Sequence, residues 1–218
     1  MNTLFFITGI GTGVGKTLVS AIVAEALGAD YWKPVQAGLE DGTDSNLVKE
    51  LISNPHTQVH PELYRLQTPA SPHIAARIDQ LEIQSKAISQ SMQKIIATIG
   101  NKPLVIEGAG GLLVPLSETL LTADLIKQLN ARAILVSRNY LGSINHSLLT
   151  AAYCRSNGID VAGWIFTDDY MQYETEIVQW SGYPSLGSVA NLPVINKEII
   201  HEQAMRIQPA LLKMVNES

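Results

Sequence analysis

Gly9-Ile10-Gly11-Thr12-Gly13-Val14-Gly15-Lys16-Thr17 is the stretch of sequence that decides the fold. The apolar run 4–8 before it predicts a buried strand. Residues 16–27 behind it place apolar side chains at helical spacing, with Gly28 as a C-cap. A glycine-rich loop between a strand and a helix is typical of proteins that bind phosphate at the helix N-terminus. We therefore expect a strand, a phosphate-binding loop and a helix at the start of the chain.

The side chains of this loop suit a nucleotide with its metal. Glycines at positions 11, 13 and 15 let the backbone approach a ligand closely, and successive N–H groups can form an anion nest. Lys16 supplies a cation for the β- and γ-phosphates, and the Thr17 hydroxyl supplies a ligand for Mg²⁺. The strict P-loop pattern has glycine where this chain has Ile10, with Gly9 one residue earlier, so the loop is a variant. A dinucleotide-binding fingerprint fails because Val14 occupies its third glycine position.

Beyond the loop, strand-like and helical segments alternate along the chain. This alternation predicts an α/β P-loop fold, a single domain over residues 1–218, with a mostly parallel sheet covered by helices on both faces. In such sheets ligands bind beyond the carboxyl ends of the strands. The expected strands are 31–34, 104–107, 133–136, 161–166 and 185–189, and the expected helices are 44–52, 83–99, 123–129, 143–157, 173–180 and 199–214.

Composition and charge narrow the range of partners. Apolar residues make up 46% of the chain, charged residues 16%, and the net charge is −5. A globular protein of this kind is a poor partner for nucleic acid or for an anionic membrane. No apolar run reaches about 18 residues and the N-terminus lacks a signal-peptide pattern, so we expect a cytoplasmic location. The single cysteine, Cys154, excludes an internal disulfide and fits a reducing compartment.

Three polar residues stand where ligands are expected to bind. Glu107 follows a buried apolar run, where a carboxylate could hold the metal or its waters. Lys33 ends another predicted strand, where it could stabilise negative charge or simply be exposed to solvent. Asp44 could be a ligand, but its spacing alone favours a cap at the start of the helix that follows. His73 and His146 are better explained as hydrogen-bonded structural residues than as catalysts.

Together these segments resemble the dethiobiotin synthetase family over most of the chain, from the first strand to about Pro193. A P-loop alone would be unspecific, whereas the ordered set of motifs is specific. The matching segments are 9–17, Lys33-Pro34-Val35-Gln36-Ala37-Gly38, Asp44, Ser71-Pro72-His73-Ile74, Glu107-Gly108-Ala109-Gly110-Gly111, Pro115-Leu116-Ser117, Leu141-Gly142-Ser143-Ile144-Asn145-His146 and Ala162-Gly163-Trp164.

The resemblance implies a cyclo-ligase of biotin biosynthesis. Members of the family carboxylate 7,8-diaminononanoate with CO₂ and close the ring to dethiobiotin, converting ATP to ADP and phosphate. The reaction passes through a carbamate and a carbamic–phosphoric anhydride. Each step builds or moves negative charge, so the chemistry requires a cation-rich pocket that excludes water. The implied partners are these small molecules, Mg²⁺ with ATP, and a second copy of the chain.

The same resemblance implies roles for individual residues. Catalytic contacts to carbamate and phosphoryl oxygens fall to Lys33, Lys16 and Thr12, and Mg²⁺ ligands to Thr17, Asp44 and Glu107. The implied nucleotide-binding residues are Gly13, Val14, Gly15, Lys16, Thr17, Leu18, Asp44, Glu107, Gly108, Ala109, Gly110, Thr167, Asp168, Gly187, Ser188 and Val189. The implied substrate-binding residues are Ala37, Ser71, Pro72, Ser143, Ile144 and Asn145. The last three belong to a helix N-terminus that meets the substrate carboxylate of the partner subunit, which implies a homodimer.

The chain departs from the family pattern at three places. The family commonly has Ser or Thr at the position of Ala37, so only backbone groups or Gln36 could replace that hydroxyl. The family often reads adenine with Asn at the position of Thr167, whose single hydroxyl cannot make the paired contact of an amide. Segment 187–190 lacks the usual acidic residue and proline. These differences bear on base selectivity more than on the reaction.

Two other classes of protein share parts of this pattern. Partition- and septum-site ATPases carry a second lysine early in the loop, where this chain has Gly11. Amidoligases of the cobyric-acid type need a glutaminase domain with a nucleophilic cysteine, and Cys154 falls in the middle of a predicted helix. Stimulation of ATPase activity by DNA or lipid would favour the first class.

Overall fold

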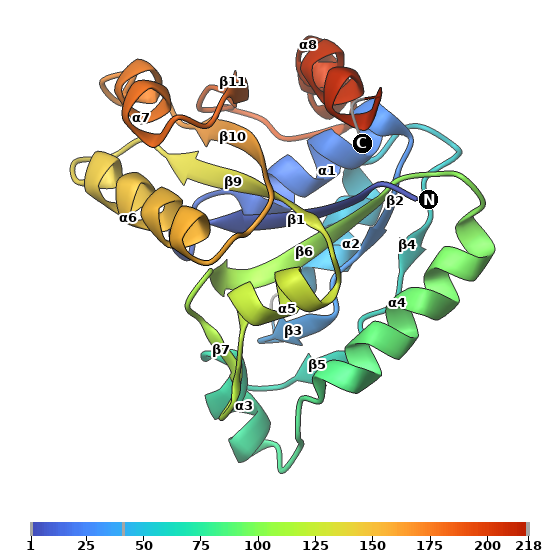
Figure 1. Ribbon diagram of the computed structural model, residues 1–218. Helices are drawn as coiled ribbons and strands as arrows, with labels where there is room; N and C mark the ends of the chain where they lie inside the picture. The colour runs from blue at the N-terminus through green and yellow to red at the C-terminus, as the bar shows by residue number, and fades with distance from the viewer. Residues whose placement is uncertain (1, 41, 217–218) are drawn as a thin grey trace.

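A computed structural model describes residues 2–40 and 42–216. Its centre is a seven-stranded sheet in the order β11-β10-β9-β1-β6-β2-β4, with every neighbouring pair parallel (Figure 1). The strands are β1 (Leu4–Gly9), β2 (Asp30–Trp32), β4 (Val59–His60), β6 (Leu104–Gly111), β9 (Arg132–Arg138), β10 (Val161–Thr167) and β11 (Ser185–Val189). The prediction of an α/β fold with a mostly parallel sheet is confirmed.

Helices cover both faces of the sheet, as predicted. One apolar cluster joins the sheet to α1 (Lys16–Leu27), α2 (Asp44–Leu51) and α8 (Lys197–Asn216). The other joins it to α4 (Ser85–Ile99), α5 (Thr122–Gln128), α6 (Ser143–Ser156) and α7 (Glu174–Ser181). Along β1, Phe5 and Ile7 lie in the first cluster and Phe6 in the second, because successive strand side chains point to opposite faces. A strand buried on both faces must be apolar throughout, which explains the unbroken run in the sequence.

Helix α1 has the bounds predicted from its periodicity. Gly28 ends it at φ 56°, where its N–H reaches the carbonyls of the last turn. Glu25, near that end, accepts hydrogen bonds from Ser53 and Asn54 and lies 3.0 Å from Nδ1 of His201 in α8. Burial alone would raise the pKa of Glu25, but the hydrogen bonds from Ser53, His201 and Asn54 lower it to about 2. This cluster fastens α8 to α1.

Several short elements near the carboxyl edge of the sheet were not predicted. The short parallel pair is β3 (Val35–Ala37) with β5 (Tyr64–Leu66), the antiparallel pair is β7 (Pro115–Ser117) with β8 (Leu120–Leu121), and the helix is α3 (Pro72–Ile78). The chain leaves the main sheet after Trp32, because Pro34 has no N–H to donate to a neighbouring strand. It then forms β3 at one side of the cavity described below.

Most of the predicted boundaries differ from the structure by one or a few residues. The predicted strand 31–34 ends at Trp32, for example, and strand β4 was not predicted. Strand β6 continues to Gly111, so Glu107 lies inside the strand and not at its end. Helix α4 begins at Ser85 and not at position 83. Among the described residues, no helix is long and apolar enough to cross a membrane.

Candidate active site

The loop between β1 and α1 has the backbone shape that a phosphate nest needs. Gly13 and Gly15 have positive φ values of 72° and 88°, whereas Gly11 does not. Within the described chain, no side chain caps α1 at Gly15, so the first N–H groups of the helix are left for a ligand. Lys16 folds back over the loop, and its Nζ donates to the carbonyl oxygen of Gly11 at 3.0 Å.

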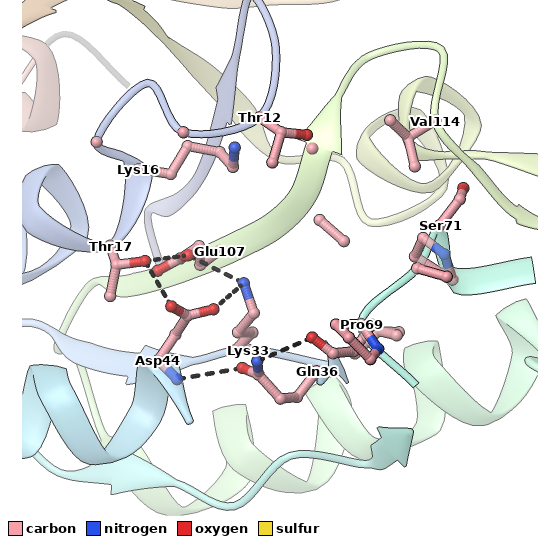
Figure 2. A pocket seen from close by; sticks show the side chains of 18 residues that line it. Thr12, Lys16, Thr17, Lys33, Gln36, Asp44, Pro69, Ser71, Glu107 and Val114 are labelled. Atoms are coloured by element: carbon pink, nitrogen blue, oxygen red, sulfur yellow. Dashed lines mark hydrogen bonds and ion pairs between the residues drawn. The ribbon is translucent and has the colours of Figure 1, made fainter. Parts of the chain in front are cut away.

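A cavity of about 780 Å³ opens beside this loop, bounded by the β2–β3 connection, the start of α2, β6 and residues 69–72 (Figure 2). Most of the residues predicted to act at the site line it. They are Thr12, Gly13, Gly15, Lys16, Thr17, Lys33, Ala37, Asp44, Ser71, Pro72, Glu107, Ala109 and Gly110. The cavity also has an apolar side formed by Val35, Pro69, Ala70 and Val114.

A buried ion cluster forms the floor of the cavity. Lys33 is 4% exposed, and its Nζ lies 2.9 Å from both Asp44 Oδ2 and Glu107 Oε1. Burial lowers the pKa of Lys33, but the carboxylates of Glu107 and Asp44 outweigh it, so its pKa is raised. Burial raises the pKa of Asp44, but Lys33 and Thr17 bring it below its usual value. Lys33 and Asp44 are therefore both charged at neutral pH.

The same cluster brings three oxygen atoms close together: Thr17 Oγ1, Asp44 Oδ1 and Glu107 Oε1. The Thr17 hydroxyl lies 2.8 Å from Asp44 Oδ1 and 2.9 Å from Glu107 Oε1, although it has a single proton to donate. Among the described residues, no group of three or more His, Cys, Asp or Glu side chains could hold a metal. Two carboxylates and a hydroxyl nevertheless fit Mg²⁺, which takes one or two carboxylates and completes its shell with phosphate and water.

Lys16 provides a second cation at the opposite side of the cavity. Burial lowers its pKa to about 8, with a smaller opposing effect from Glu107. Because a buried ammonium group is poorly solvated, an anionic ligand that pairs with it would be bound favourably. Figure 2 shows Lys16 and Lys33 approaching the cavity from the loop and from the floor respectively.

The structure resolves the two explanations of Asp44. The cap of α2 is Thr43, whose Oγ1 accepts a hydrogen bond from the N–H of Asn46 at 3.2 Å. The carboxylate of Asp44 is therefore left for Lys33 and Thr17.

The two histidines make ordinary side-chain contacts. His73 Nδ1 lies 3.1 Å from Ser71 Oγ, and His146 Nδ1 lies 2.6 Å from the hydroxyl of Tyr140.

Two further residues make contacts with Glu107 and Asp44 that were not predicted; Tyr31 carried no signal in the sequence, and Gln36 was considered only as a substitute for the hydroxyl missing at Ala37. Tyr31, fully buried on β2, donates from its hydroxyl to Glu107 Oε2 at 2.9 Å. Gln36, on β3, accepts a hydrogen bond from the N–H of Asp44 at 3.1 Å. A tyrosine in an apolar strand and a glutamine in a loop have many uses, so their contacts depend on the folded arrangement.

The remaining predicted residues lie outside the cavity of this single chain. Thr167 is 6% exposed, and its hydroxyl donates to the carbonyl oxygen of Val14 at 2.8 Å. That hydroxyl supports the phosphate loop from β10 and is turned to the backbone. Within the described residues, the predicted residues that do not line the cavity are Val14, Leu18, Gly108, Ser143, Ile144, Asn145, Thr167, Asp168, Gly187, Ser188 and Val189.

A loop with a lysine at a helix N-terminus, beside a second lysine that is paired with two carboxylates, is typical of a phosphate-binding site. The molecule is accordingly a P-loop α/β protein. A family model described as an AAA domain matches residues 3–199. Solved structures agree on the fold. The cell division protein MinD of Aquifex aeolicus has a TM-score of 0.62 at 12% identity over 99% of this chain and 98% of that one. A ParA family ATPase of Chlorobium tepidum has a TM-score of 0.59 at 13% identity over 100% and 95%.

The sequence of this chain is much more similar to a second group of proteins than to MinD or ParA. The ATP-dependent dethiobiotin synthetase BioD of Cytophaga hutchinsonii is 48% identical over 204 residues, 93% of this chain and 96% of that protein. The protein of the same name from Christiangramia forsetii is 45% identical over 215 residues, 98% and 100% respectively. The chain belongs to the dethiobiotin synthetase family, which confirms the resemblance read from its motifs. The likeness to MinD and ParA shows the shared fold alone.

Proposed function

We propose that this protein uses ATP and CO₂ to convert 7,8-diaminononanoate into dethiobiotin, with ADP and phosphate as the other products. One amine nitrogen bonds to the carbon of CO₂ and releases a proton, which gives a carbamate. A carbamate oxygen takes the γ-phosphoryl group while ADP leaves. The second amine then bonds to the carbamate carbon and releases a proton, phosphate leaves, and the ureido ring is closed. Family membership supports this reaction, and the ion cluster supports its placement in the cavity.

The proposed roles follow from where negative charge develops. Lys16 and Lys33 face the cavity from two sides, so they can stabilise oxygens of the transferring phosphoryl group and of the carbamate. Thr12 lines the same space beside the loop and can donate a hydrogen bond to those oxygens. Electrostatic stabilisation by these lysines is stronger than it would be in bulk water, because both side chains are largely buried.

Thr17, Asp44 and Glu107 are the proposed ligands of Mg²⁺. Bound Mg²⁺ would offset charge on the phosphates of ATP. Lys33 and Tyr31 hold the carboxylate oxygens of Glu107 in place, and Thr17 and Lys33 hold those of Asp44. The chain thus orients the carboxylates before the metal arrives.

Recognition of the diamine is proposed to combine an apolar wall with a second subunit. Val35, Pro69 and Val114 line the cavity and suit the hydrocarbon chain of the substrate. The carboxylate tail is assigned to the N-terminus of α6, residues 143–145, of a partner copy. Ser143–Asn145 do not reach the cavity of their own chain, and Leu141 and Leu149 beside them are 81% and 61% exposed. A homodimer would cover these leucines.

We assign the other predicted nucleotide residues, at 167–168 and 187–189, to the region of the sugar and base of ATP, since these residues end β10 and β11 at the same edge of the sheet. Thr167 would contribute packing there and no hydrogen bond to the base, because its hydroxyl donates to Val14. The proposed unit of function is one domain over residues 1–218. The proposed location is the cytoplasm, where a free buried cysteine such as Cys154 stays reduced.

The observation that carries the proposal is the pair of buried lysines lining one cavity that Asp44 and Glu107 also line. The test is to mix the purified protein with 7,8-diaminononanoate, ¹³C-bicarbonate and MgATP. We expect dethiobiotin carrying one ¹³C, detected by mass, together with one ADP per product. ATP hydrolysis without a labelled ureido product would overturn the proposal.

A further inference from the structure

Gln36 is a buried polar residue beside the proposed metal ligands, 7% exposed. Its Nε2 lies 3.2 Å from the carbonyl oxygen of Gly38 and 3.4 Å from that of Ala37. Its Oε1 accepts a hydrogen bond from the backbone N–H of Asp44 at 3.1 Å (Figure 2). Both polar ends of the side chain are therefore committed to backbone groups, although Gln36 borders the cavity.

The contact to Asp44 lies at the start of α2. The first N–H groups of a helix have no partner within the helix and must be satisfied from outside. Thr43 satisfies the N–H of Asn46, but Thr43 moves with α2 because it is the adjoining residue. Gln36 comes from β3, which pairs with β5. Its hydrogen bond therefore ties the start of α2 to another part of the fold.

The hydrogen bond to Gln36 holds Asp44, one of the proposed Mg²⁺ ligands. The backbone N–H that Gln36 holds belongs to Asp44, whose carboxylate lies 2.8 Å from Thr17 and 2.9 Å from Lys33. We propose that Gln36 is a positioning residue that sets the Asp44 carboxylate for Mg²⁺, and that it does not bind the diamine. The proposal rests on the proposed role of Asp44 as a metal ligand. The sequence had left Gln36 open as a substitute for the hydroxyl missing at Ala37, and the geometry directs it to Asp44.

The test compares two substitutions of similar length. Gln36→Met keeps the shape of the side chain and removes every hydrogen bond. Gln36→Glu keeps an oxygen that can accept from the N–H of Asp44. Mn²⁺ binding is measured by electron paramagnetic resonance in the presence of a non-hydrolysable ATP analogue. We expect Gln36→Met to weaken Mn²⁺ binding about fivefold, the factor typical of one lost hydrogen bond. Gln36→Glu should bind Mn²⁺ at least as tightly as the unaltered chain.

A matched control separates positioning from general stability. Thr43→Val removes the cap that belongs to α2 itself, so it should lower Tm while Mn²⁺ affinity stays within about twofold of the unaltered chain. The Mg²⁺ concentration for half-maximal activity should rise in Gln36→Met, with the KM for diaminononanoate unchanged. Should Gln36→Met fail to fold, Gln36→Asn shortens the side chain beyond reach of Asp44 and is held to the same expectation.

Three results would overturn the assignment. They are unchanged Mn²⁺ affinity in Gln36→Met, equal weakening in Gln36→Met and Gln36→Glu, and a raised KM for diaminononanoate with metal affinity intact. The Mn²⁺ titration needs no diamine. A protein that makes no dethiobiotin therefore refutes the proposed reaction separately from the role of Gln36.

Discussion

Replacing Lys33 by alanine should lower the stability of the metal-free protein. In the presence of Mg²⁺, the same substitution should stop the reaction. Removing one partner of a buried ion pair costs about 3–5 kcal/mol, because the charge left behind is uncompensated. Here Glu107 is 1% exposed and loses its cation, while Tyr31 still donates a hydrogen bond to it and the Thr17 hydroxyl lies 2.9 Å away. We therefore take the lower value, about 3 kcal/mol, which for a chain of this size lowers Tm by about 6–12 °C.

Added Mg²⁺ should restore part of this loss. The two carboxylates freed from Lys33 attract the metal more strongly, and binding to the folded state alone raises stability. Differential scanning fluorimetry in EDTA and in MgCl₂ should show a larger metal-induced rise in Tm for Lys33→Ala than for the unaltered chain. The control is Lys49→Ala, since Lys49 is an exposed lysine of α2. Lys49→Ala should change neither the Tm in EDTA nor the rise in Tm that MgCl₂ produces.

Catalysis provides the second measurement of the same variant. MgATP should still bind, because the phosphate loop is intact, but turnover to dethiobiotin should fall about 100-fold or more, about 2.7 kcal/mol of transition-state stabilisation. A Lys33→Ala protein that turns over normally would remove Lys33 from catalysis. A Tm in EDTA equal to that of Lys49→Ala would show that the ion cluster does not hold the apoprotein together.

Three further outcomes are expected. Light scattering should give about twice 23.7 kDa for a homodimer, and a stable, fully active monomer would contradict the sharing of residues 143–145. Steady-state kinetics should show kcat/KM for ATP, CTP and GTP within about 50-fold, because the Thr167 hydroxyl is spent on the loop backbone. A preference for ATP beyond about a thousandfold would show that another group reads the base. Glu25→Gln should lower the unfolding free energy in urea by about 2 kcal/mol at pH 7. A carboxyl whose pKa is lowered from 4.5 to about 2 stabilises the fold above pH 4.5, and that gain is lost as pH falls through 2. The difference from the unaltered chain should shrink over that range, and a constant difference would contradict it.

Local sequence was sufficient to predict the phosphate loop. A strand, a glycine-rich turn and a helix are contiguous in the chain, so chain connectivity alone puts Lys16 and Thr17 at the helix N-terminus. The alternation of strands and helices was likewise sufficient for the α/β class. The motif set identified the family, because its residues occur in a specific order over most of the chain. The boundaries of most elements differ by a few residues from those predicted. Strand β6 is longer than predicted because the small residues after Glu107 continue a strand without a marker in the sequence.

The tertiary structure decided how the site is connected. Thr17 and Glu107 are 90 residues apart, and they meet because β6 lies beside β1 in the sheet. No sequence pattern predicted the contacts that Tyr31, Gln36 and the inward-facing hydroxyl of Thr167 make. The physical reason is that hydropathy and turn residues encode which segments are strands and which helices. Strand order and register, which bring distant side chains within hydrogen-bonding distance, depend on how the faces of those segments pack against one another.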